Sequence, residues 1–254
     1  MTRASALPGR PRAPRRPFTA ARRRILSAAL AVLVAVAGPA MAASAASAAP
    51  AAGPARLSGY ATHYSLGPDG RTTNANCSLP AIPKDRLYVA VGPDLYAGGA
   101  GCGSYLDVTG PHGTVRVEVA DSCHECVHGH LDLSEEAFRA IGDYDAGIIT
   151  TSYVPVAAST VPPLSFRFKD GSSAYWAALQ VLDAGVRLRS VELWVGARWV
   201  PLSLTDYGYW LAPGYVGAGP FTVRVTDTTG RTATVQGIVL DPMRLQHTAS
   251  CSTR

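Results

Sequence analysis

Short β-like runs separated by turn residues constrain the fold of this chain more than any other feature of its sequence. Val115, Val117 and Val119 alternate with polar or small residues, which is the period-two pattern of a half-buried strand. Similar runs recur between residues 59 and 227, whereas only residues 135–141 carry a helical pattern. Many short strands with few helices are typical of barrels and sandwiches. We therefore predict an all-β protein.

The expected elements form two groups, separated by the boundary sequence Ser159-Thr160-Val161-Pro162-Pro163. The first group has a helix capped by Ser134 and stopped at Gly142, and the strands Gly59–Tyr64, Leu87–Val91, Ser104–Thr109, Thr114–Ala120, His130–Leu133 and Gly147–Val156. The second comprises Ser165–Lys169, Tyr175–Leu182, Ser190–Val195, Arg198–Leu204 and Phe221–Asp227. We predict two domains, at 55–158 and 162–243, with a polar tail beginning at about Pro242.

The first 48 residues are expected to be a signal peptide and an Ala/Ser linker. An arginine-rich segment ends at Arg24, an apolar stretch runs from Ile25 to about Val36, and A-x-A sites follow. Pro39 and these cleavage sites argue against a retained membrane anchor. Arg22-Arg23-Arg24-Ile25-Leu26 loosely matches a twin-arginine signal, and Sec export fits at least as well. We expect a secreted, extracellular protein with no membrane contact after cleavage.

The positive charge of the chain belongs to this leader. Eight of the 23 basic residues lie in the first fifty positions, which hold no acidic residue, and the other 15 face 18 acidic residues. Nucleic-acid binding requires a basic footprint on the folded domain, and none remains. Residues 51–160 carry six basic and twelve acidic groups, whereas residues 161–254 carry nine and six. This composition excludes a nucleic-acid partner.

The cysteines allow two interpretations. Cys123-x-x-Cys126 with His124, His128 and His130 has enough ligands for zinc, but a second paired half is missing. Export favours disulfides instead, and we predict Cys123–Cys126 and Cys77–Cys102 among the three connectivities that four cysteines allow. Cys251 stands alone in the tail, and its role stays open. We expect no metal and no organic cofactor.

Asp132 is the first candidate for chemistry. It lies between Leu131 and Leu133 on a short strand, so its side chain must point away from theirs, towards a surface or groove. A carboxylate beside an apolar wall can act as an acid. The alternative is that Asp132 or Ser134 caps the following helix. Spacing alone favours capping for Asp132.

An ordered set of motifs resembles the bacterial expansins. The motifs of the first domain are Gly59-Tyr60-Ala61-Thr62, Gly103-Ser104-Tyr105-Leu106-Asp107-Val108, Asp121, and Leu131-Asp132-Leu133-Ser134 with Ala137-Phe138. Those of the second are Lys169-Asp170-Gly171-Ser172-Ser173 and Tyr175-Trp176-Ala177-Ala178-Leu179-Gln180-Val181. The resemblance covers roughly Leu57 to Asp241. It implies a six-stranded double-psi β-barrel followed by an immunoglobulin-like β-sandwich that binds cellulose.

The resemblance also implies a polar groove in the barrel. Asp132 matches the aspartate that expansins need for wall loosening, and Asp121 and Thr62 match polar residues of the same groove. Two positions depart from the pattern. Tyr64 stands where a second threonine is usual, and Cys123 stands where bacterial relatives can have a tyrosine.

Aromatic residues of the second domain match the cellulose-binding platform of the family. Trp176 and Tyr207 match two of its three aromatics, Tyr175 stands where a tryptophan is common, and Lys169 matches a neighbouring basic residue. Aromatic rings stack on the C–H faces of glucans and remove apolar area from water. Tyr175 and Trp176 would face opposite sides of a strand, so exposing both requires a bulge or loop. The other tryptophans, Trp194, Trp199 and Trp210, are expected in the core.

The resulting hypothesis is a secreted, monomeric, non-hydrolytic wall-loosening protein whose partners are cellulose and plant or bacterial cell-wall polysaccharide. The resemblance extends to glycosidases of the same barrel type and implies that a hydrolase would have its second carboxylate just after the first strand. The nearest carboxylate there, Asp69, belongs to a Pro-Asp-Gly turn. Two alternatives remain open. One is a lytic glycan-cleaving enzyme, a peptidoglycan lytic transglycosylase or an endoglucanase-like protein, with Asp132 as its acid. The other is a purely binding, barwin-like module.

Overall fold

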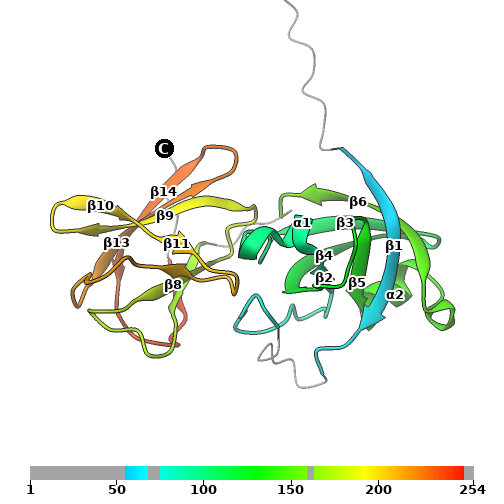
Figure 1. Ribbon diagram of the computed structural model, residues 1–254, viewed down its shortest axis with the longest axis horizontal. Helices are drawn as coiled ribbons and strands as arrows, with labels where there is room; N and C mark the ends of the chain where they lie inside the picture. Colours follow the sequence, from blue (N-terminus) through cyan, green and yellow to red (C-terminus); the bar gives the residue numbers. More distant parts are fainter. Residues whose placement is uncertain (1–54, 68–74, 159–162, 249–254) are drawn as a thin grey trace, which may run out of the picture. The chain divides into compact units, whose positions relative to one another are not determined.

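The computed structural model describes residues 55–67, 75–158 and 163–248 (Figure 1). The expected leader, the Asp69 turn and Cys251 lie outside these ranges. Among the residues that the structure describes, no helix is long and apolar enough to cross a membrane.

The first half of the described chain forms a closed six-stranded barrel with the order β1-β5-β2-β4-β3-β6 (Figure 1). Its strands are β1 (Leu57–Tyr64), β2 (Tyr88–Val91), β3 (Tyr105–Gly110), β4 (Gly113–Ser122), β5 (His130–Ser134) and β6 (Ile149–Val156). The pairs β1–β5 and β2–β4 are parallel, and the other pairs are antiparallel. This is the double-psi β-barrel that the resemblance implies.

Alternating side chains explain the barrel core. Val115, Val117 and Val119 of β4 are buried, whereas Arg116 points outward and pairs with Asp107 of β3 through a 2.7 Å hydrogen bond from Nε to Oδ1. The predicted helix is confirmed as α2 (Glu135–Ile141), with Ser134 as its N-cap. The remaining helical turns are α1 (Pro93–Tyr96), η1 (Ala97–Gly99) and η2 (Tyr144–Ala146).

The second half forms two sheets that enclose a second core, as expected for an immunoglobulin-like sandwich. One sheet has the order β10-β9-β13-β14, built from β9 (Leu188–Val195), β10 (Arg198–Pro201), β13 (Phe221–Asp227) and β14 (Thr232–Ile238). The other has the order β11-β12-β8-β7-β15, built from β7 (Ser165–Phe168), β8 (Ala178–Leu182), β11 (Ser203–Leu204), β12 (Trp210–Leu211) and β15 (Gln246–His247). Trp210 is buried between them, as predicted.

Three expected elements of this half are wrong. The predicted strand Arg198–Leu204 is divided between β10 and β11, which belong to different sheets. Strand β8 begins at Ala178 and not at Tyr175, because residues 169–177 form a turn. The chain after Pro242 is not a free polar tail, since β15 pairs with β7 and the Met243 N–H donates to the Phe168 carbonyl over 2.8 Å. The sheets therefore extend to His247.

Both predicted disulfides are present. Cys77 is bonded to Cys102 across a sequence separation of 25 residues, and Cys123 is bonded to Cys126 across a separation of 3. Because both cysteines of the C-x-x-C motif are oxidised, neither offers a thiolate to zinc. Within the described ranges, no group of three His, Cys, Asp or Glu residues could hold a metal ion.

Candidate functional site

The three candidate groove residues lie in a single row across the barrel. Thr62 of β1 is paired with Asp132 of β5, Asp132 with Ala90 of β2, and Ala90 with Asp121 of β4. Cross-strand partners point to the same face of a sheet. The two carboxylates therefore flank Ala90, whose methyl group leaves space between them.

A β-bulge places Asp121 in this row. Val89 is paired with Val119, but the next residue of β2, Ala90, is paired with Asp121, so Ala120 is an extra residue in β4. Without the bulge, Asp121 would share the buried face of Val119. Sequence alone ended this strand at Ala120 and placed Asp121 in a loop, whereas β4 continues to Ser122.

Asp132 points to the same side of the sheet as Thr62 and does not cap the helix. Its Oδ1 accepts a 2.6 Å hydrogen bond from the Thr62 hydroxyl, whereas Ser134 Oγ accepts from the N–H of Ala137, over 3.2 Å. Leu131 and Leu133, on either side of Asp132, are fully buried. Capping by Asp132, which spacing alone favoured, is therefore wrong, and the alternation argument for its direction is correct.

His130, which sequence reasoning considered only as a zinc ligand, contacts the row at Thr62. Its Nε2 lies 2.9 Å from Thr62 Oγ1. Because the single hydroxyl proton of Thr62 goes to Asp132, Nε2 of His130 must donate to Thr62. The His130 ring also stacks on Tyr60, with 4.3 Å between centroids. The signal was present in the sequence, since His130 and Tyr60 each lie two residues before a groove residue.

Asp121 is held rigidly from one side. Its Oδ1 accepts hydrogen bonds from the backbone N–H of Asn76 at 2.7 Å and of Ser122 at 2.8 Å. Burial raises the pKa of Asp121, and the two amides partly oppose that rise. The charge of Asp132 also raises the pKa, which places the two carboxylates within electrostatic reach of each other.

Tyr64 adds a bulky apolar wall next to Thr62. It lies two residues further along β1, and its ring meets the Tyr88 ring edge to face at 5.6 Å. Burial raises the pKa of its hydroxyl, and Asp121 contributes to that rise. The residue therefore remains a neutral phenol beside the two acidic groups, where a smaller hydroxyl side chain would leave the groove wider.

A second candidate surface lies at the turn between β7 and β8. Tyr175 is 78% exposed and Trp176 is 40% exposed. The Ser173 hydroxyl accepts hydrogen bonds from the N–H groups of both residues, each over 3.3 Å, and the Ser173 N–H donates to the Trp176 carbonyl over 2.6 Å. Tyr175 and Trp176 would face opposite sides of a strand, and this turn is the loop that allows both rings to be exposed.

Tyr207 and Lys169 belong to neighbouring turns of the same sheet. Tyr207 is half-buried in the turn between β11 and β12, where the Thr205 N–H donates to the Tyr209 carbonyl over 2.8 Å. Lys169 follows β7, and its Nζ lies 5.9 Å from the Tyr207 ring centroid. A cation above a ring is attracted to its face, so the two side chains support each other.

Two aromatic positions differ from the sequence interpretation. Trp194 was expected in the core but is 44% exposed on β9. Trp199 of β10 is half-buried, with its ring 5.1 Å from that of Trp194 and the Arg224 guanidinium 4.2 Å from its centroid. Both belong to the sheet that does not carry Tyr175 and Trp176. Tyr215, which the sequence analysis did not consider, is 65% exposed.

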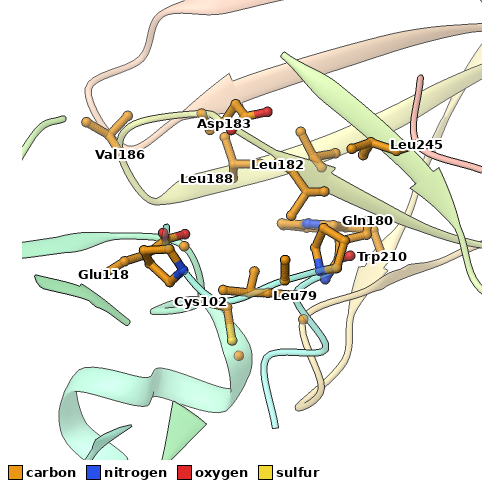
Figure 2. A pocket seen from close by; sticks show the side chains of 18 of the residues that line it. Leu79, Cys102, Glu118, Gln180, Leu182, Asp183, Val186, Leu188, Trp210 and Leu245 are labelled. Carbon is orange, nitrogen blue, oxygen red and sulfur yellow. The ribbon is translucent and has the colours of Figure 1, made fainter. Parts of the chain in front are cut away.

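A cavity of about 400 Å³ has a lining that does not include Thr62, Asp121 or Asp132 (Figure 2). Its labelled lining includes Leu79, Glu118, Gln180, Leu182 and Trp210. Burial raises the pKa of Glu118 to about 7, and the charges of Asp183 and Asp85 add to the rise. Burial of this carboxylate therefore disfavours its charged form, and it lies on β4, three residues before Asp121.

Glu118→Gln is expected to stabilise the protein above about pH 4.5, with the full effect above about pH 7. Between about pH 4.5 and 7 the folded state binds more protons than the unfolded state, so the free energy of unfolding falls as pH rises. At pH 8 the substitution should therefore raise that free energy by on the order of 2 kcal/mol. Below about pH 4.5 the effect should vanish, because Glu118 is then neutral in both states.

Urea unfolding at pH 4 and pH 8 measures this effect, with Glu125→Gln as the control because Glu125 is an exposed glutamate. An equal stabilisation by Glu118→Gln at both pH values would contradict the assignment.

Comparisons with known proteins agree with this architecture. A family model described as "Lytic transglycolase" matches residues 88–153, from β2 into β6. Expansin-YoaJ of Bacillus subtilis is 36% identical over 177 residues, covering 68% of this chain and 74% of that protein. A crystal structure of an apo expansin from Clavibacter michiganensis has a TM-score of 0.75 and 55% identity, covering 77% of this chain and 97% of that one. The same values hold for an aspartate-to-asparagine mutant of that expansin in complex with cellohexaose. The chain belongs to the expansin family.

Proposed function

We propose that this protein is secreted and loosens cell walls without hydrolysis. In this proposal the barrel groove holds a glucan chain, and the aromatic turns of the sandwich anchor the protein on cellulose. The observation that carries the proposal is the row of paired residues across the barrel. In this row Asp132 lies across Ala90 from Asp121, and the Thr62 hydroxyl donates a 2.6 Å hydrogen bond to Asp132. The cellohexaose complex of the Clavibacter expansin supports a glucan as the ligand.

The groove is suited to binding hydroxyl groups. Carboxylate oxygens of Asp132 and Asp121 accept hydrogen bonds from sugar hydroxyls, and bonds to charged acceptors are stronger than neutral ones. The stacked rings of Tyr60 and His130 form the pair two residues before Thr62 and Asp132, so they extend the site towards the start of β5. A chain held in this way exchanges its contacts with neighbouring glucans for contacts with the protein. Loosening then requires no broken glycosidic bond.

The proposal excludes glycoside hydrolysis. Most hydrolases need a proton-donating carboxylic acid and a second carboxylate that acts as base or nucleophile. Strand β1, which supplies Thr62 to the row, carries no carboxylate, and Asp132 accepts a hydrogen bond from Thr62. The family model described as "Lytic transglycolase" favours one alternative, cleavage with Asp132 as a single acid. Release of new chain ends distinguishes the two functions.

The direct test incubates the mature protein with crystalline cellulose and assays bound protein in the pellet and reducing ends in the supernatant. Binding without reducing ends, together with creep of cell-wall strips under constant load, is the expected result. Reducing ends that disappear in Asp132→Asn would identify a glycan-cleaving enzyme instead. Binding without creep would identify a purely binding, barwin-like module.

Trp176→Ala is expected to weaken cellulose binding by about tenfold, because the indole loses its stacking and its burial of apolar area. The dissociation constant on crystalline cellulose measures the effect. Trp194→Ala is the matched control, since Trp194 is about equally exposed but lies on the other sheet. Equal losses in the two variants would contradict the assignment of the binding surface to the β7–β8 turn.

A further inference from the structure

Tyr215 forms a ring pair with Tyr175 that no motif of the sequence indicated. The centroids of the two rings lie 5.2 Å apart, and their planes are inclined by 53°. Both side chains are largely exposed, at 65% for Tyr215 and 78% for Tyr175. Two segments separated by forty residues therefore present adjacent rings to solvent.

The backbone fixes Tyr215 in this position. The next residue, Val216, is 5% exposed and packs in the sandwich core, so Tyr215 points outward. The Val216 N–H donates to the carbonyl of Ala174 over 2.8 Å, which ties this segment directly to the turn that carries Tyr175. The Ala212 N–H makes a second tie, over 2.9 Å, to the carbonyl of Ala177. The two bonds thus hold the backbone of Tyr215 beside the turn that carries Tyr175, and in this arrangement the two rings are inclined to each other.

The tilt restricts what the pair can bind. The surface of a cellulose crystal presents its sugar rings in one plane, and rings that stack on it must be parallel to that plane. Two rings inclined by 53° cannot both lie flat against a plane. A single glucan chain can rotate about its glycosidic bonds, so successive sugar units can meet each ring face to face.

We propose that the Tyr175–Tyr215 pair is a subsite for a single, non-crystalline glucan chain. The proposal rests on the proposed function, because it assigns a preferred form of substrate to the same aromatic surface. Trp176 remains the contact for flat cellulose. The pair holds a chain that has left the crystal plane, and Tyr215 thereby sets the preference for disordered glucan.

The test compares Tyr215→Ala, Tyr215→Phe and Trp176→Ala in binding to crystalline cellulose, phosphoric-acid-swollen cellulose and soluble cellohexaose. Loss of one stacked ring is expected to weaken binding of Tyr215→Ala to swollen cellulose and cellohexaose by about three- to tenfold. Its binding to crystalline cellulose should change by less than about twofold. Tyr215→Phe keeps the ring and should bind all three substrates normally, and Trp176→Ala should lose affinity for the crystalline form.

Each outcome decides between the two proposals. An equal loss by Tyr215→Ala on crystalline and swollen cellulose would replace the tilted subsite with a flat platform. No loss on any substrate, with normal binding by the unaltered protein, would overturn the role of Tyr215 and leave the proposed function standing. No binding by the unaltered protein would overturn both. Thermal unfolding of Tyr215→Ala, expected near that of the unaltered protein, checks that Val216 still anchors the segment.

Discussion

Asp132→Asn is expected to abolish wall loosening while leaving cellulose binding intact. The asparagine retains an oxygen that accepts the Thr62 hydroxyl, so the 2.6 Å contact and the register of β1 against β5 can persist. It loses the negative charge and gains an amide that donates. Hydrogen bonds to sugar hydroxyls then weaken, because bonds to a charged acceptor contribute about 1.5–3 kcal/mol against about 1 kcal/mol for neutral ones. Creep of wall strips under constant load measures the loss.

A loss of this size has to be separated from a loss of structure. Ser134 and not Asp132 caps α2, so the helix should be unaffected, and the midpoint of urea unfolding should hardly move. Asp107→Asn is the matched control. It makes the same change of charge in the same barrel, at a carboxylate that pairs with Arg116 on β4. Creep retained by Asp132→Asn, or lost equally in both variants, would contradict the groove assignment.

The fold was predictable where the signal is local. The alternation of Val115, Val117 and Val119 fixes the core face of β4, and the Ser134 cap with Gly142 defines α2. Which strands become neighbours depends on pairing between distant segments, and no local pattern encodes it. The parallel pairing of β1 with β5 is therefore visible only in the structure.

The candidate site shows the same division. The direction of Asp132 follows from its flanking leucines, whereas Asp121 reaches the row through a bulge at Ala120 that the even spacing of valines conceals. The positions of the surface aromatic residues were harder to predict. The sequence of a half-exposed strand does not show whether its tryptophan packs inward or faces solvent. Trp194 was therefore assigned to the core, where it does not lie. Tyr215 lies in a Gly- and Pro-rich segment without periodicity, and only its contact with Tyr175 in the structure makes it a candidate binding residue.

The two disulfides are expected to differ sharply in their contribution to stability. Closing the 25-residue loop between Cys77 and Cys102 removes more chain entropy from the unfolded state than closing the short loop between Cys123 and Cys126. The chain-entropy relation gives about 3.5 kcal/mol for the longer loop and about 1.6 kcal/mol for the shorter one. Cys77 is also fully buried, and its carbonyl accepts a 3.0 Å hydrogen bond from Gln180 of β8.

Replacing Cys77 and Cys102 together with serine is therefore expected to lower the midpoint of thermal unfolding by about 10 °C, since about 1 kcal/mol corresponds to roughly 2–4 °C in a chain of this size. A buried hydroxyl at position 77 and a half-buried one at position 102 would add to the loss. The same double replacement at Cys123 and Cys126 is the matched control and should lower the midpoint by less than half as much. Calorimetry of both variants under non-reducing conditions measures the difference. If the Cys123/Cys126 variant were the less stable of the two, the short bridge would stabilise the folded loop next to Asp121, and loop entropy would not be the main source of its effect.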